Sequence, residues 1–313
     1  MKKKIRIIEK VLPSLEKSFE SCDLCVRNCG VDRSKGVKGF CEAGDKAIVY
    51  SYSPHHGEEP PVSGARGSGT IFFSRCSMSC KYCQNYQFSQ TSEGKEVSCE
   101  ELGDIMLELQ EMRCHNINLV TPTHFMPVIA RALKHAYSHS LSIPVVYNTG
   151  GYDSMDAIRA LDGVVEVYLP DMRYSSDIFA ERYSSAPGYV GNNRRIVKEM
   201  HKQAGSLKMC DGVASRGLMI RLLILPGGIS GTEDTLGFIS REAGKETYLS
   251  VMSQYYPAYM AKKHAELSRR INREEYSSVI TKMHQLGMNN GWVQPFEGEF
   301  DGRFAGENFE SNL

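Results

Sequence analysis

Three closely spaced cysteines in the run CSMSCKYC are the residues of this chain best suited to chemistry. Cys76, Cys80 and Cys83 come directly after a short apolar segment, Thr70–Phe73. Three thiolates this close together can bind one face of a [4Fe–4S] cube and leave the fourth iron without a protein ligand. An open coordination position is characteristic of catalytic metal centres. The alternatives are a zinc site completed by a distant histidine, or buried free thiols.

A second group of four cysteines lies near the N-terminus, at Cys22, Cys25, Cys29 and Cys41. Four thiolates close a metal site, so structural Zn²⁺ and an auxiliary [4Fe–4S] cluster would both fit this spacing. Buried free cysteines are the remaining interpretation. Iron–sulfur is slightly favoured over zinc, because a second cluster could relay an electron to the first.

The composition describes an ordinary soluble globular chain. Of its 313 residues, 41% are hydrophobic and 24% are charged, and the 37 basic residues equal the 37 acidic ones in number. This balance provides no overall field that would attract nucleic acid or an anionic membrane. No apolar run approaches the roughly 20 residues that a membrane-spanning helix needs. Charged residues such as Glu9 and Lys10 interrupt a signal-peptide pattern, so we expect an amphipathic N-terminal helix and a cytoplasmic location.

Short apolar runs alternate with helical patterns from about residue 66 onward. The predicted strands share a nearly apolar composition, typical of strands that are buried on both faces. They are Thr70–Phe73, Ile117–Val120, Ile143–Tyr147, Val164–Leu169, Leu218–Leu225 and Tyr248–Met252. The predicted helices occupy about 98–111, 125–137, 154–161, 177–204 (with a break), 232–242 and 272–287. Ser98 with Glu101, and Asn272 with Glu275, are helix-start signals.

This alternation predicts a parallel sheet with right-handed crossovers. Six units are too few for an eight-fold barrel, so a doubly wound sheet and a partial barrel both fit the pattern.

The motif CSMSCKYC resembles the signature of the radical S-adenosylmethionine (SAM) superfamily. The stretches CDLCVRNCGVDR, INLVTPTHFMP, VVYNTGGY, VYLPDMRY and RGLMIRLLILPGG resemble more narrowly the PflX group, homologues of pyruvate formate-lyase activating enzyme. The resemblance implies a partial (β/α)6 TIM-like barrel. It divides the chain into an N-terminal helix and cysteine-rich cap (1–65), the barrel (66–290) and a C-terminal tail (291–313).

The resemblance also implies a chemistry. Cys76, Cys80 and Cys83 would bind the cluster, and the unique iron would chelate SAM. One electron would cleave SAM to methionine and a 5′-deoxyadenosyl radical that abstracts hydrogen from a substrate. Tyr82 would lie near the adenine, and the electron would come from a donor such as flavodoxin or ferredoxin.

The chain departs from the superfamily pattern after the second predicted strand. Many members carry Gly-Gly-Glu there, where it meets the SAM amino group, whereas this chain has Thr121-Pro122-Thr123-His124. A threonine hydroxyl or a backbone carbonyl could accept from that ammonium, without the charge of a carboxylate. His124 is only a weak catalytic candidate. Further candidate contacts to SAM follow later strands, at Asn148, Asp171 with Arg173, Arg221 and, less favoured, Gln254.

A cluster of histidine and glutamate lies just before the first predicted strand, at His55, His56, Glu58 and Glu59. Such a cluster can form a metal or acid–base site. Because the chain enters this strand from the far end of the barrel, a solvated or capping role is at least as well favoured.

Three functions remain open from sequence. An activating enzyme would abstract hydrogen from a glycine of a partner glycyl radical protein. A second radical SAM enzyme would act on a small molecule. A non-catalytic zinc or iron–sulfur binding protein is the third and least favoured, since Cys76, Cys80 and Cys83 follow a strand in the catalytic arrangement.

Overall fold

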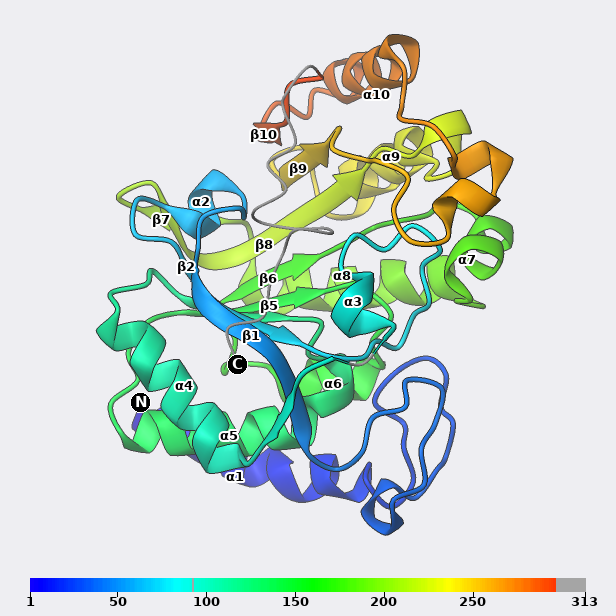
Figure 1. The fold of residues 1–313 in the computed structure, drawn as a ribbon. Coiled ribbons are helices and arrows are strands. Elements are labelled where there is room, and N and C mark those ends of the chain that lie inside the picture. The colour runs from blue at the N-terminus through cyan, green and yellow to red at the C-terminus, as the bar shows by residue number, and fades with distance from the viewer. Residues whose placement is uncertain (92, 297–313) are drawn as a thin grey trace.

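One large sheet forms the centre of the molecule (Figure 1). The structure is a computed structural model, and it describes residues 1–91 and 93–296. Within these residues the strands follow the order β10-β9-β8-β6-β5-β4-β2-β1-β3, with β7 paired to β8. The segment EGEFDGRFAGENFESNL, predicted as a loosely packed C-terminal extension, lies outside the described residues.

The six predicted strands are all present and parallel, which confirms the α/β fold of the partial-barrel type. They are β2 (Ser68–Phe73), β4 (Ile117–Val120), β5 (Val145–Thr149), β6 (Val167–Pro170), β8 (Val213–Leu223) and β9 (Tyr248–Met252). Every residue of β2, β4, β5, β6 and β9 is buried, as the apolar runs predicted.

Four further strands were not predicted: β1 (Ala47–His55), β3 (Lys95–Val97), β7 (Lys208–Cys210) and β10 (Gly291–Val293). β1 pairs antiparallel with both β2 and β3, and β10 pairs parallel with β9. The sheet therefore begins inside the predicted cap region and continues into the predicted tail region.

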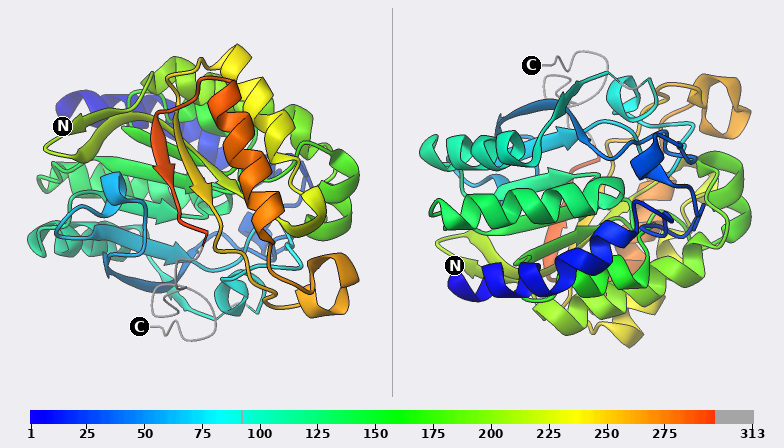
Figure 2. Two further views of the ribbon diagram at one scale, coloured as in Figure 1. Left: turned by 90° about the horizontal axis from the view of Figure 1, so that it is seen from above. Right: turned by 90° about the horizontal axis from the view of Figure 1, so that it is seen from below.

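Helices connect the parallel strands and cover the outside of the sheet, as both views of Figure 2 show. The longer helices are α1 (Lys2–Lys17), α4 (Cys99–Glu111), α5 (Met126–Ser138), α6 (Met155–Ala160), α7 (Asp177–Ser184), α8 (Tyr189–Ala204), α9 (Thr232–Glu242) and α10 (Arg273–Gln285). α2 (Pro60–Ser63) and α3 (Tyr86–Ser89) are single turns, and 3-10 turns span Arg33–Lys35, Thr123–Phe125, Pro226–Gly228, Ala261–Lys263 and Ala265–Leu267.

Local signals explain where several helices begin. The Ser98 hydroxyl accepts a hydrogen bond from the Glu101 amide at 3.1 Å, and the Glu101 carboxylate accepts one from the Ser98 amide at 2.7 Å. Asn272 and Glu275 form the same reciprocal arrangement before α10. Both predicted capping boxes are thus confirmed, and the predicted break in 177–204 separates α7 from α8. Among the described residues, no helix is both long and apolar enough to span a membrane.

Candidate radical SAM site

The cysteine loop leaves β2 through a sharp turn and is then fixed by backbone hydrogen bonds. Arg75 adopts a left-handed conformation with φ of 74°, and its amide donates to the Phe88 carbonyl at 2.9 Å. Further along, the Ser79 amide donates to the Ser184 carbonyl at 2.9 Å, and the Lys81 amide to the Tyr183 carbonyl at 2.8 Å. The loop is therefore held between α3 and the end of α7.

The thiols of Cys76, Cys80 and Cys83 line one pocket beyond the carboxyl ends of the parallel strands. Each sulfur has a polar neighbour. The Ser184 hydroxyl donates to Sγ of Cys80 at 3.0 Å, and the Met78 amide donates to Sγ of Cys76 at 3.4 Å. Sγ of Cys83 lies 3.2 Å from the hydroxyl of Ser89.

This donor set fits an iron–sulfur cluster. Hydrogen bonds to sulfur stabilise and tune thiolate ligands. Burial raises the pKa of the Cys83 thiol to about 11 and that of the Cys76 thiol further, so cluster binding would release protons. In residues 1–91 and 93–296, no three His, Cys, Asp or Glu side chains converge closely enough to bind a single metal ion. A cube gives each cysteine a separate iron, so its three ligands do not converge on one point.

Several predicted SAM contacts line the same pocket: Tyr82, Thr121, Asp171, Arg221 and Gln254. Tyr82 is buried, donates to the Tyr174 hydroxyl at 2.8 Å, and packs edge-on against the Tyr255 ring. Thr121 has a φ of 59°, so the chain turns abruptly where β4 ends. The structure thus brings together residues that follow four strands, β2, β4, β6 and β9, with Arg221 near the end of β8.

Two arginines and an aspartate give the pocket a charged wall. Asp171 forms ion pairs with both Arg173 and Arg221, the latter with Oδ1 3.6 Å from Nε. Nη1 of Arg221 donates to Oδ1 of Asn148 at 3.3 Å, and its Nη2 faces Sδ of Met252 at 3.6 Å. A thioether is a weak acceptor, so Nη2 of Arg221 can instead donate a hydrogen bond to a stronger acceptor on a bound ligand.

Beneath this wall, Glu58 and Glu59 enter the barrel from its other end. Oε1 of Glu59 lies 3.2 Å from Nε of Arg221 and accepts a hydrogen bond from the Ser250 hydroxyl at 2.7 Å. Oε1 of Glu58 accepts from the Asn118 amide at 3.0 Å. Burial raises the pKa of Glu58 to about 7. Of the two roles considered for these glutamates, the solvated one does not apply, because the segment before α2 folds into the barrel, and Glu59 precedes α2 without a side-chain capping bond.

Three predicted residues lie outside the pocket lining. The Thr123 hydroxyl donates to Oδ1 of Asp153 at 2.6 Å and is buried. Asn148 lies one hydrogen bond away from the pocket, against Arg221. His124 is buried with Nε2 2.8 Å from the Ser74 carbonyl, and burial lowers its pKa to about 3. His124 and Thr123 therefore support the strand ends from behind.

The sequence reasoning did not identify other lining residues, among them Met78, Gln84, Asn85, Gln90 and Met252. Gln84 and Asn85 follow Cys83 directly, so their proximity to the cysteines was a usable signal. Met252 is the last residue of the predicted strand β9, which also places it at this edge. Glu58 and Glu59 were noticed as part of a His/Glu cluster, but nothing in the sequence indicated their position next to Arg221, because only the folded barrel brings them there.

The four N-terminal cysteines lie in the loops between α1 and β1, and all are free thiols. The Cys22 amide donates to the Val31 carbonyl at 3.1 Å, and the segment between these residues forms the turn that carries Cys25 and Cys29. Burial, with smaller contributions from the nearby Cys41 and Cys22, raises the pKa of the Cys25 thiol to about 12.

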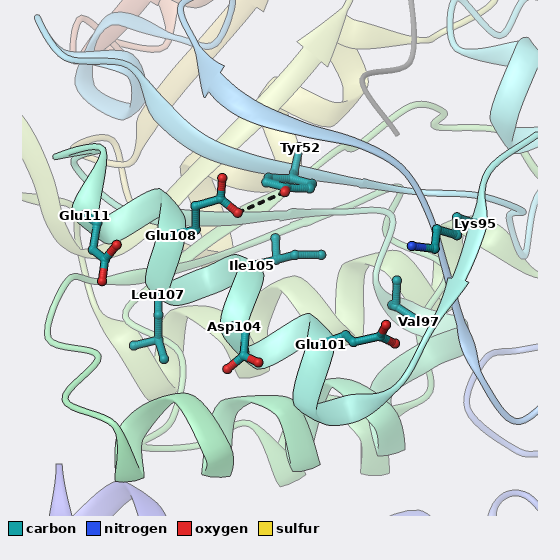
Figure 3. A pocket seen from close by; sticks show the side chains of 9 residues that line it. All are labelled: Tyr52, Lys95, Val97, Glu101, Asp104, Ile105, Leu107, Glu108 and Glu111. Atoms are coloured by element: carbon teal, nitrogen blue, oxygen red, sulfur yellow. Dashed lines mark hydrogen bonds between the residues drawn. The ribbon is translucent and has the colours of Figure 1, made fainter.

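A separate pocket lies on the outside of the sheet, between β1, β3 and α4 (Figure 3). Its lining includes the acidic side chains of Glu101, Asp104, Glu108 and Glu111, and the Tyr52 hydroxyl donates to Glu108 at 2.9 Å. It contains none of the predicted site residues. We therefore assign the functional site to the cysteine pocket.

The parallel sheet, the cysteine loop and the pocket define a class of protein that carries a cluster at the carboxyl edge of a partial barrel. The sequence model of the radical SAM superfamily matches residues 70–239, and the chain belongs to that superfamily. Its members are enzymes, and the family implies a [4Fe–4S] cluster and SAM.

Known proteins similar to this chain include one from Methanocaldococcus jannaschii, the uncharacterized protein MJ0674. It is 29% identical over 273 residues, which cover 84% of this chain and 74% of the relative. Among solved structures, SuiB of Streptococcus suis bound to the precursor peptide SuiA has a TM-score of 0.50 at 8% identity, over 71% of this chain and 47% of SuiB.

HydG, a maturase of the [FeFe]-hydrogenase, also has a TM-score of 0.50, at 14% identity, over 70% of this chain and 49% of HydG. The chain thus spans about half the length of these two structures. At such low identity the likeness concerns the fold alone.

Proposed function

We propose that this chain cleaves SAM reductively at the pocket of Cys76, Cys80 and Cys83, and that the resulting radical abstracts hydrogen from a substrate. A reduced [4Fe–4S] cluster held by Cys76, Cys80 and Cys83 would supply the one electron that cleaves SAM to methionine and a 5′-deoxyadenosyl radical. The observation that carries the proposal is a set of three free thiols, each with a polar neighbour, in one loop that opens into a pocket.

The chain's own residues would position SAM and exclude water. Tyr82 offers a buried aromatic wall for the adenine, and Asp171 offers carboxylate oxygens for the ribose hydroxyls. Thr121, where the backbone turns, lines the pocket, and its carbonyl or hydroxyl would bind the amino group in place of a charged partner. Arg221 would donate hydrogen bonds to the carboxylate of the methionine part of SAM. Asn148 would hold the guanidinium of Arg221 in place.

The PflX resemblance supports an activating enzyme as the finer function. Its substrate would be the α-hydrogen of a glycine in a glycyl radical protein, and its electron donor a flavodoxin or ferredoxin. We also propose the division into a cap (1–65), a barrel (66–290) and a tail (291–313) as functional units, although β1 and β10 extend the sheet across both boundaries.

The charged wall favours a second candidate, a small-molecule substrate. Asp171 and Arg221 are assigned to SAM above, which leaves Arg173 as the charged lining residue for a substrate, and a glycine residue within a peptide carries no charge to pair with it. Ionised groups on a small substrate would pair with such a wall. A non-catalytic metal-binding protein is the weakest of the three hypotheses, since superfamily members are enzymes.

The test is anaerobic. The protein is reconstituted with iron and sulfide, reduced, and given SAM, and 5′-deoxyadenosine is quantified beside a Cys76→Ala variant. Product that requires Cys76 supports the proposal, and intact SAM in a fully loaded protein would overturn it. A persistent protein radical in a co-purified glycyl radical protein would favour the activase. Deuterium transfer into 5′-deoxyadenosine from a labelled small molecule would favour the alternative.

A further inference from the structure

Arg33 in the N-terminal cap is a buried cation without an acidic partner. Arg33 is only 1% exposed. Nε donates to the Gly44 carbonyl at 2.9 Å, Nη1 faces Sγ of Cys22 at 3.8 Å, and the Phe19 ring centroid lies 5.1 Å away. Across residues 1–91 and 93–296, no Asp or Glu forms an ion pair with Arg33.

An uncompensated buried charge is unfavourable by several kcal/mol, so a counter-charge is expected close to the Arg33 guanidinium. The atom that faces it is the sulfur of Cys22, which lies among the other cap cysteines. A neutral thiol offers little compensation, whereas thiolates bound to a metal centre carry negative charge. The buried arginine therefore indicates that the cysteine sulfurs of the cap carry negative charge when a metal centre is bound.

The backbone around these cysteines also leaves room for their sulfurs. A Cβ atom at Gly39 would lie 2.6 Å from Sγ of Cys29, so a side chain at position 39 would displace that sulfur. Glycine at this position keeps the sulfur of Cys29 free to face the other thiols.

We propose that Cys22, Cys25, Cys29 and Cys41 hold a second [4Fe–4S] cluster, balanced by Arg33, through which an electron reaches the catalytic site. The claim that the cap binds a cluster depends only on observations in the cap. The relay part rests on the radical SAM function proposed above.

The position of the cap argues for a relay rather than a distant structural staple. Nε of Arg27 donates to the Ser77 carbonyl at 2.7 Å, inside the catalytic cysteine loop. The same guanidinium lies 3.2 Å from the centroid of the Phe40 ring. Cys41 of the cap and Cys76 of the catalytic loop line one small cavity. A zinc staple could stabilise the cap anywhere on the surface, whereas an electron relay must lie beside the site it serves.

The relay balances as a single-electron transfer. A reduced one-electron carrier protein would reduce the cap cluster and would itself become oxidised. The cap cluster would then pass that electron to the catalytic cluster and return to its oxidised state. Cleavage of one SAM consumes this electron, and no proton or further reactant is required.

The binding test uses a chain in which Cys76, Cys80 and Cys83 are all changed to alanine. After anaerobic reconstitution with iron and sulfide, the cap should retain about four irons and four sulfides per chain and give the electron paramagnetic resonance (EPR) signal of a reduced cluster. One zinc per chain, or no metal with four freely reactive cap thiols, would overturn the proposal. Since this variant lacks the catalytic cysteines, its result is independent of whether the enzyme cleaves SAM.

The relay test compares the unaltered holoprotein with the triple-alanine variant used in the binding test. With both clusters reduced, the EPR spectrum should show broadening or splitting from magnetic interaction between two nearby paramagnets. That interaction should be absent from the triple-alanine variant. A spectrum that is the simple sum of two isolated clusters would overturn the relay.

Discussion

The two cysteine groups use the same ligand type but are positioned in different ways. The catalytic thiols lie on a loop that leaves a buried parallel strand and is held by backbone hydrogen bonds to the end of α7. The cap thiols lie in turns whose regular structure is limited to the 3-10 turn Arg33–Lys35 and short bridges. The sheet can thus preform the catalytic site, whereas the cap depends more heavily on its metal for order.

The buried arginines of the two regions also differ in how their charge is compensated. Arg221 in the barrel has three carboxylates within ion-pair distance, from Glu58, Glu59 and Asp171. Arg33 in the cap has a carbonyl and a sulfur as its polar neighbours. The barrel compensates its buried charges with its own side chains, whereas in the cap the proposed cluster would fill that role. The predictions below test each side of this difference.

The largest expected effect is that of Cys80→Ala on SAM cleavage. Loss of one of three cluster ligands should reduce 5′-deoxyadenosine formation to the level without protein. Iron in the cap should remain, at about half of the total in the unaltered holoprotein. Anaerobic product analysis with iron quantification measures both. Cys210→Ala, at an exposed lone cysteine, is the matched control and should change neither value. Retained cleavage in Cys80→Ala would mean that the catalytic ligands are misassigned.

Arg33→Met should weaken metal binding in the cap and leave the catalytic cluster in place. Removing one member of a buried charge pair typically costs about 3–5 kcal/mol, which corresponds to at least about a 100-fold loss of affinity. Competition with a chelator, followed by iron analysis in the background of the catalytic alanine variant, measures this loss. Lys35→Met is the control, because its exposed side chain lies on the same 3-10 turn. Equal iron retention in both variants would show that Arg33 does not balance the site.

The sequence was most informative where chemistry and local signals coincide. The apolar runs located β2, β4, β5, β6, β8 and β9, but not β10, because strands buried on both faces are apolar along most of their length. The pairs Ser98–Glu101 and Asn272–Glu275 located two helix starts, since such contacts span only three residues. Cys76, Cys80 and Cys83 could be grouped because one loop carries all three.

The features that could not be predicted from the sequence depend on contacts between residues far apart in the chain. β1 was missed because its run of serine, tyrosine, proline and histidine reads as irregular until β2 and β3 pair with it. Glu58 and Arg221 are far apart in sequence, and nothing local indicates that a carboxylate enters the barrel beneath a strand arginine. The same limit applies to Arg33, whose burial follows from the path of the cap loops.

On the barrel side, Glu58→Gln should remove a pH dependence of stability. Burial raises the pKa of Glu58 to about 7 from the ordinary 4.5. The folded state therefore binds this proton more tightly than the unfolded state, and stability is lost as the pH rises from about 4.5 through 7. The difference corresponds to about 3 kcal/mol. Glutamine cannot ionise, so between pH 5 and pH 8 the variant should gain about 2 kcal/mol of stability relative to the unaltered protein, most of the full difference.

Urea unfolding of the metal-free proteins across this pH range measures the gain and avoids effects of cluster loss. Glu111→Gln, at an exposed position on α4, is the control and should follow the unaltered protein at every pH. A stability difference for Glu58→Gln that stays constant with pH would show that Glu58 is ionised throughout. The barrel would then carry an unbalanced carboxylate, and the contrast with the cap would weaken.

The smallest expected effect is that of Ser184→Ala, which removes the hydroxyl that donates to Sγ of Cys80. Loss of a hydrogen bond to a metal ligand typically lowers metal affinity by about 10- to 100-fold. The catalytic cluster should therefore be lost to a chelator before the cap cluster, which reverses the order expected for Arg33→Met. Ser277→Ala, at an exposed position on α10, should behave as the unaltered protein. If Ser184→Ala instead released both clusters together, the two sites would share their stability, and the cap would be part of the catalytic scaffold rather than a separate ligand-dependent unit.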